Sequence, residues 1–224
     1  MKYILQLRSS IRALLALLVL ALPWPGTAED LSINAQLLAA ARNGDEAALA
    51  RALERGAAPD SRNRIGDTAL LLTCKKGLTG MAQMLVKHNA NVDQPNLEGV
   101  TPLIAATDGG YREIVSTLLA RHPNLAATDR VHKTAMVYAA GQGHTAIVRL
   151  LLEAGVDPNA VYANDLTALM WAAGYGRNEV AAALLDAGAR VDLRDNRGKT
   201  ALAIAEEAGY KETAALLLKR ETGH

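Results

Sequence analysis

The 224-residue sequence lacks the residues that build cores from large rings and those that cross-link a chain. It has no Phe and only 4% aromatic residues, so alanine and leucine must fill the interior, which favours closely spaced helices. A single cysteine excludes an intramolecular disulfide and a zinc cluster built from cysteines. Because 24 Lys and Arg nearly balance 23 Asp and Glu, no net charge attracts nucleic acid or an anionic membrane.

The first 28 residues have the three-part pattern of a secretory signal peptide. Three basic residues precede an apolar run over 13–22, and the small residues Gly26 and Ala28 stand three places and one place before a cut ahead of Glu29. The apolar run is too short to cross a hydrocarbon core of about 30 Å as a helix. We therefore expect cleavage of 1–28, export to the bacterial periplasm and no stable membrane insertion afterwards.

Cleavage would leave 29–224 with 21 basic and 23 acidic residues. The lone Cys74 fits an oxidising compartment, where a second free thiol would risk mispairing.

A period of 33 residues runs through the rest of the chain, which is the mark of a repeat architecture. One column of the repeat is threonine, at Thr68, Thr101, Thr134, Thr167 and Thr200. Nine residues after each threonine stands a glycine, at Gly77, Gly110, Gly143, Gly176 and Gly209.

Each repeat has the local signals of a turn followed by two short helices. The threonine is expected to cap a first helix of about eight residues, and Pro102 occupies a first helical position, where its missing N–H costs nothing. The glycine allows the left-handed conformation that reverses the chain into a second helix. Asx residues before the threonine supply turn chemistry, at Asn63, Asn96, Asp129 and Asp195.

Three stretches carry a resemblance to the ankyrin repeat. They are Thr-Pro-Leu-Ile-Ala-Ala at 101–106, Gly-His-Thr-Ala-Ile-Val at 143–148 and Leu-Leu-Glu-Ala-Gly-Val-Asp-Pro-Asn at 151–159. The resemblance implies an all-α solenoid of stacked helix-turn-helix units with β-turn tips, forming one domain over 29–224. Its six repeats would span 30–62, 63–95, 96–128, 129–161, 162–194 and 195–224, with the first and last as caps.

Several positions depart from the ankyrin pattern. His132 and Asp165 stand where the turn glycine is expected, and His122-Pro123 replaces the usual Gly-Ala after the second helix. We expect the junction between the third and fourth repeats to be locally irregular.

No arrangement of residues suggests catalysis, a metal site or a cofactor. The five histidines are scattered over different columns, and there is no His-Glu-x-x-His, phosphate-binding loop or nucleophile elbow. Cys74 is interpreted as a small residue packed between helices, although Lys75 and Lys76 beside it keep a reactive thiol open as an alternative.

The ankyrin resemblance also implies a protein-binding surface, made by the turn tips and the exposed flank of each first helix. Carried over by position, it nominates Arg64, Ile65, Asp67, Lys75, Lys76, Leu97, Glu98, Val100, Asp108, Arg130, Val131, Lys133, Tyr138, Gln142, Tyr162, Asn164, Leu166, Trp171, Tyr175, Arg197 and Lys199. The rings matter most, because Trp and Tyr anchor protein interfaces. The alternative is that Tyr138 and Trp171, at equivalent positions in adjacent repeats, stack on each other between helices.

The resulting hypothesis is an exported, monomeric scaffold that binds another protein through its concave face and has no enzymatic activity. Some similar proteins are thought to support periplasmic enzymes such as catalases in oxidative-stress defence. An immunity or inhibitor protein that blocks a toxin or hydrolase in the same compartment is the alternative. An enzyme is a third class, for which no matching residues are present.

Overall fold

A computed structural model describes residues 32–222. The chain divides into two compact units, Met1–Ser32 and Ile33–His224, and the described helices all belong to the second. The predicted signal peptide, 1–28, lies outside the described residues.

The described part of the chain is helical and contains no strand, which confirms the expected all-α class. One short 3-10 helix, η1 (Ala163–Asp165), interrupts the regular series. The α-helices are α2 (Ile33–Asn43), α3 (Glu46–Glu54), α4 (Ala69–Lys76), α5 (Thr79–Lys87), α6 (Pro102–Asp108), α7 (Arg112–Leu119), α8 (Ala135–Gln142), α9 (Thr145–Glu153), α10 (Ala168–Gly174), α11 (Asn178–Asp186), α12 (Ala201–Glu207) and α13 (Lys211–Glu221).

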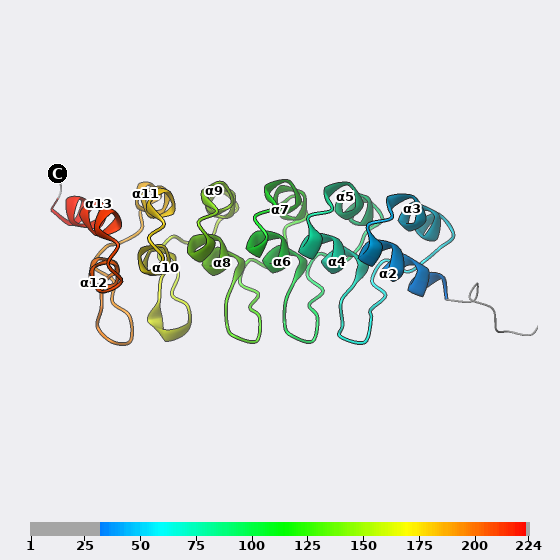
Figure 1. Cartoon of the computed structure of the whole chain (residues 1–224), viewed down its shortest axis with the longest axis horizontal. Helices are drawn as coiled ribbons and strands as arrows, with labels where there is room; N and C mark the ends of the chain where they lie inside the picture. The colour runs from blue at the N-terminus through cyan, green and yellow to red at the C-terminus, as the bar shows by residue number, and fades with distance from the viewer. Residues whose placement is uncertain (1–31, 223–224) are drawn as a thin grey trace, which may run out of the picture. The chain divides into compact units, whose positions relative to one another are not determined.

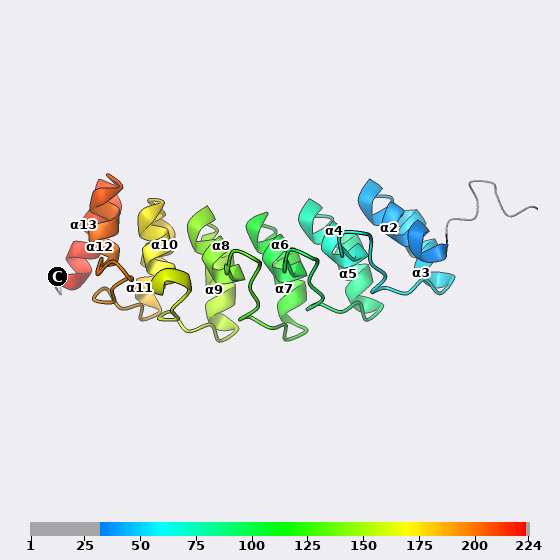
Figure 2. The ribbon, with the colours of Figure 1, turned by 90° about the horizontal axis from the view of Figure 1, so that it is seen from below.

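Within the second unit the helices form two rows with a layer of loops beside them. Figure 1 shows the even-numbered helices α2 to α12, here called the inner helices, in one row and the odd-numbered outer helices α3 to α13 in the other. The loops that join one pair to the next extend beyond the inner row. Figure 2 shows these loops crossing in front of the helix pairs. This is the expected helical repeat solenoid.

Five loops connect the six helix pairs. We call them L1 to L5, and they cover 55–68, 88–101, 120–134, 154–167 and 187–200.

The inner helices begin as the sequence predicts. The Thr101 hydroxyl accepts a hydrogen bond from the Ile104 N–H at 3.2 Å, and the threonines at 68, 134, 167 and 200 cap their helices in the same way. The repeated glycines all adopt positive φ. Gly176 has φ of 64°, and an added Cβ there would lie 2.3 Å from the Tyr210 ring of the next repeat, so both the backbone conformation and the close contact require glycine.

Small side chains let neighbouring pairs approach closely. Ala106, Ala139 and Ala172 each have no exposed surface, and they occupy the same position in three successive inner helices. Leu118 and Leu151 in the outer helices are also fully buried. Burying one such leucine stabilises the fold by about 2 kcal/mol. The buried side chains of successive helix pairs belong to one continuous core.

The non-glycine residues at unusual turn positions adopt the conformation expected from their places in the repeat. His122, His132 and Asp165 have φ of 51°, 58° and 58°. The junction between the third and fourth repeats nevertheless keeps its hydrogen bonds to the preceding loop, because the Asp93 carboxylate accepts from the Asn124 N–H at 2.8 Å. L3, the loop that contains this junction, is separated by a cavity from L4, the loop that follows it.

The threonine cap can be tested at Thr101. We expect Thr101→Val to lower the free energy of unfolding by about 1 kcal/mol, because it removes the acceptor for the Ile104 N–H while keeping the side-chain shape. Thr101→Ser keeps a hydroxyl and is the matched control. Urea unfolding followed by circular dichroism measures both, and equal losses in the two variants would contradict a capping role.

Candidate protein-binding surface

The tips of L1, L2 and L3 expose apolar side chains in a row. Ile65, Leu97 and Val131 are 57%, 74% and 56% exposed. Each tip is held by the Asx residue before it: the Asn63 side-chain oxygen accepts hydrogen bonds from the N–H groups of Ile65 and Asp67. The same tips expose the charged side chains of Arg64, Glu98 and Arg130.

Neighbouring tips are joined by backbone hydrogen bonds. The Leu97 N–H donates to the Ile65 carbonyl at 3.1 Å, and the Arg130 N–H donates to the Glu98 carbonyl at 2.8 Å. The Arg130 guanidinium also lies 3.3 Å from the Glu98 carboxylate. The first three tips therefore present their side chains from a connected backbone.

Four side chains, from L3, α8, α10 and the residue that follows α10, form what we call the aromatic cluster: Lys133, Tyr138, Trp171 and Tyr175. The Trp171 and Tyr175 rings are stacked, with centroids 6.0 Å apart and planes 6° from parallel. The Lys133 ammonium lies 4.8 Å from the Trp171 ring centroid and 5.5 Å from that of Tyr138. The cation thus links the two aromatic side chains across the repeat boundary.

The alternative, a stack between Tyr138 and Trp171, is wrong, because Trp171 stacks on a different ring. Trp171 stacks on Tyr175 of its own repeat, while Lys133 lies between the Tyr138 and Trp171 rings and contacts both. The Tyr138 hydroxyl donates to an Asp129 carboxylate oxygen at 2.6 Å, which orients the ring. Tyr175 remains 48% exposed and is the most exposed ring of the cluster.

A depression of about 120 Å³ lies beside this cluster. Gln142 and Arg177 also line it, and Arg177 Nε donates to the Gly141 carbonyl at 2.9 Å. Arg177 was missed from the sequence. Tyr111, His144 and Tyr210 occupy the same position in other repeats, directly after the repeated glycine. This series of large polar side chains was the signal that the sequence offered.

The Trp171 indole N–H is buried and has no hydrogen-bond partner among residues 32–222. A buried N–H without an acceptor lowers the free energy of unfolding, so Trp171 stabilises the fold less than it would with its indole N–H hydrogen-bonded.

Asp67, which the sequence nominates for the binding surface, is instead a buried structural residue. It is only 2% exposed, and its carboxylate accepts from the Lys75 ammonium at 2.9 Å and from the Asn96 side-chain amide at 2.9 Å. Lys75 is thereby engaged within the fold, and Lys76 donates to the Arg42 carbonyl of the previous repeat. The sequence could not show this, because exposure at a turn position depends on how the next loop packs.

Other nominated residues are partly engaged within the fold. Asp108 is exposed, but its carboxylate accepts from the Gln142 amide at 3.1 Å. In the last repeat Arg197 pairs with the Asp195 carboxylate at 2.7 Å, and Lys199 pairs with Glu207. Val100 is half-buried.

The nominated residues of L4 have no tip bond to L3, although Asn164 accepts a hydrogen bond from the Asn196 N–H of L5. Tyr162 and Leu166 are half-buried, whereas Asn164 is exposed and adopts φ of 61°. Burial raises the pKa of the Tyr162 hydroxyl, and interaction with the Thr134 side chain partly offsets that rise.

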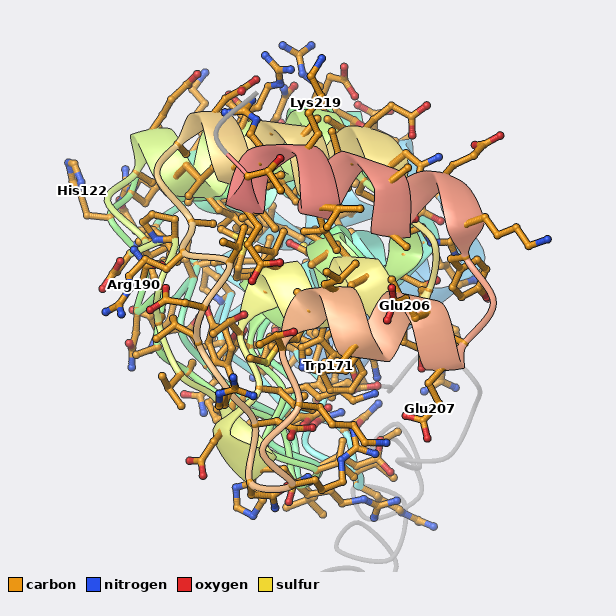
Figure 3. All side chains as sticks on the ribbon, turned by 90° about the vertical axis from the view of Figure 1, so that its left-hand side faces the viewer. His122, Trp171, Arg190, Glu206, Glu207 and Lys219 are labelled. Atoms are coloured by element: carbon orange, nitrogen blue, oxygen red, sulfur yellow. The ribbon has the colours of Figure 1, made fainter. Side chains whose placement is uncertain are left out.

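The two sides of the second unit differ in what they present. Viewed from its C-terminal end in Figure 3, His122 and Arg190 lie on one side, and Glu206 and Glu207 on α12 lie on the other. The C-terminal end of an inner helix, which carries part of the nominated surface, is therefore well separated from the turns that follow the outer helices.

Cys74 has no exposed surface, and burial raises the pKa of its thiol strongly. It packs between helices, as interpreted from the sequence. Among residues 32–222 no group of three or more His, Cys, Asp or Glu side chains is placed to hold a metal ion. No helix in the same range is long and apolar enough to span a membrane.

The fold and surface define a helical repeat solenoid of the kind that binds proteins. A family model described as ankyrin repeats (3 copies) matches residues 37–129, 98–162 and 136–223. The chain belongs to the ankyrin repeat family, whose repeats commonly mediate protein–protein interaction. No curated protein matches the sequence.

The environment of Tyr138 has a measurable consequence. Burial, followed by the hydrogen bond to Asp129 and its negative charge, raises the pKa of the Tyr138 hydroxyl. We expect it to stay protonated near pH 10, where an ordinary tyrosine is half ionised. Because the folded-state pKa is the higher one, the stability it confers is full below about pH 10 and declines above it.

Ultraviolet titration of the native protein beside Tyr138→Phe isolates this group. Asp129→Asn should lower the pKa of Tyr138 while keeping the turn, since Asn63 and Asn96 serve the same turn in other repeats. A Tyr138 that ionises with the exposed tyrosines would contradict the described contact.

Proposed function

We propose that this chain is an exported scaffold that binds a protein partner through its concave face, centred on the aromatic cluster. The observation that supports the proposal is the cluster itself: an alanine-rich array with 4% aromatic residues places Tyr138, Trp171 and Tyr175 together beside a depression. Aromatic anchors next to a pocket are typical of the residues that dominate binding energy.

The surface is held in position before a partner arrives. Tyr138 is fixed by Asp129, and Lys133 is fixed by contacts with two rings. The tip backbones of L1, L2 and L3 are joined to one another. Little side-chain or loop entropy would then be lost on binding, which favours affinity.

Export and a supporting role for a periplasmic enzyme in stress defence are further parts of the proposal. The signal-peptide pattern at 1–28 supports export, and the buried Cys74 is compatible with an oxidising compartment. We infer a binding role rather than catalysis from membership of a family of interaction repeats.

The proposal is tested with a variant in which Tyr138, Trp171 and Tyr175 are all changed to Ala. The native protein should capture a partner from envelope extract, and the purified partner should bind the triple variant at least about 30-fold more weakly, because one interface anchor alone is worth about 2 kcal/mol. Leu218→Ala, which removes an exposed apolar side chain from α13, is the control and should bind as the native chain does.

Circular dichroism must first establish that the triple variant keeps its helices. Equal capture by the native and triple-variant proteins would contradict the aromatic cluster as the binding surface. The effect on the partner then separates the two roles: an enzyme that loses activity without this protein supports the scaffold, whereas a toxin or hydrolase that is blocked by it supports the immunity alternative.

A further inference from the structure

A side chain in one loop usually accepts a hydrogen bond from the backbone of the next. Asp60 accepts from the Asn91 N–H at 2.7 Å, which ties L1 to L2. Asp93 ties L2 to L3, and Asn159 ties L4 to L5 by accepting from the Arg190 N–H at 2.8 Å. These acceptors occupy one column of the 33-residue repeat.

The same column holds an alanine in L3. Ala126 has no side-chain acceptor, and the Asp157 N–H, which would be its partner in L4, makes no hydrogen bond among the described residues. L3 and L4 thus lack the tie that joins the other loops.

A second tie is missing between the tips of the same two loops. Tip bonds join Leu97 to Ile65, Arg130 to Glu98, and Asn196 to Asn164. The corresponding pair would be the Ala163 N–H and the Val131 carbonyl, and neither makes a backbone hydrogen bond within the part of the chain that the structure describes.

The local sequence explains why this tip differs. Tyr162 stands where Asn63, Asn96, Asp129 and Asp195 supply the turn acceptor in other repeats. Without that acceptor the L4 tip forms η1, with Asn164 and Asp165 both at positive φ.

A cavity of about 640 Å³ lies between the parted loops. Its L3 wall includes Leu125 and His132, and its L4 wall includes Val156, Val161 and Tyr162. Figure 1 shows the L4 loop (yellow) standing further from L3 than L3 stands from L2. The inner helices α8 and α10 still pack against each other, so the opening is confined to the loop layer.

We propose that this L3–L4 cleft binds an extended, apolar peptide segment of a partner protein as an added strand. The Val131 carbonyl, at the L3 tip next to His132 of the cavity lining, and the Ala163 N–H in the L4 lining belong to positions that bond directly at other junctions. A peptide backbone placed between them can donate to the first and accept from the second. The Asp157 N–H offers a further donor, and the cavity accepts an apolar side chain.

An extended backbone fits these observations better than a small apolar molecule does, because the unpaired groups of the two loops are main-chain donors and acceptors. The cleft is also separate from the aromatic cluster. The cavity is lined by His132 and Thr134 but not by Lys133, which lines the depression instead. The proposal therefore stands whether or not the aromatic cluster binds a partner.

The probe is the blocked peptide acetyl-Thr-Val-Ile-Val-Thr-amide, titrated into the full mature chain by calorimetry. A matched peptide with an N-methylated Ile keeps the apolar side chains but loses a backbone donor. We expect the first peptide to bind and the second to bind about tenfold more weakly or worse. Equal affinity for the two would overturn strand addition and mark the cleft as a pocket for small apolar molecules, and no binding of either would overturn the proposal.

Ala126→Asp tests the site within the protein. It restores the acceptor that Asp60 and Asp93 provide elsewhere, so it should tie down the Asp157 N–H, close the cleft and reduce peptide affinity about tenfold or more. Ala146→Asp, at an exposed position near the start of α9, adds the same charge away from the cleft and should leave binding unchanged.

A folded Ala126→Asp protein, verified by its thermal melting, that binds as tightly as the native chain would also overturn the proposal. The variant with Ala at 138, 171 and 175 should keep full peptide affinity. This last comparison separates failure of the cleft from failure of the aromatic cluster.

Discussion

Burial of each helix pair against the next is the constraint on which the rest of this structure depends. A single pair of short helices cannot cover its own apolar face, so the pairs are stable only when stacked. The stack requires small side chains where the inner helices meet, as at Ala106, Ala139 and Ala172. Because these positions recur every 33 residues, the loops that follow them are also brought into register.

Register in the loop layer determines where binding groups are presented. At most junctions a side chain of one loop bonds the backbone of the next, and the tips follow as a connected series. Rigid tips and a fixed aromatic cluster favour capture of a partner with little loss of entropy. The L3–L4 junction keeps the helix packing but loses both loop ties, so backbone groups that are satisfied elsewhere become available to another chain.

Features that depend on local chemistry could be predicted from the sequence. The threonine caps, the left-handed glycines and the positive φ of His132 follow from steric and hydrogen-bonding preferences within a few residues. The exposure of individual site residues could not be predicted in this way. Asp67 is buried because Asn96 of the next loop reaches its carboxylate, and Trp171 stacks on Tyr175 because of side-chain rotamers that the column pattern does not specify.

The sequence also carries a signal for the opening between L3 and L4. Ala126 and Tyr162 stand in two columns of the repeat that Asx residues otherwise fill. The meaning of this signal depends on contacts between loops about 31 residues apart, as in the bond from Asn91 to Asp60. Only the arrangement of both loops reveals that two neighbouring ties are lost together and that a cavity lies between them.

Amide hydrogen exchange of the free protein, resolved residue by residue by NMR, tests this account most directly. The N–H groups of Asn91, Asn124 and Arg190 donate hydrogen bonds to side chains of the preceding loop. These amides should therefore exchange slowly. The Asp157 and Ala163 N–H groups should exchange rapidly, although the helices on both sides remain protected. Equal protection of Asp157 and its counterparts would contradict a loop layer interrupted at this one junction.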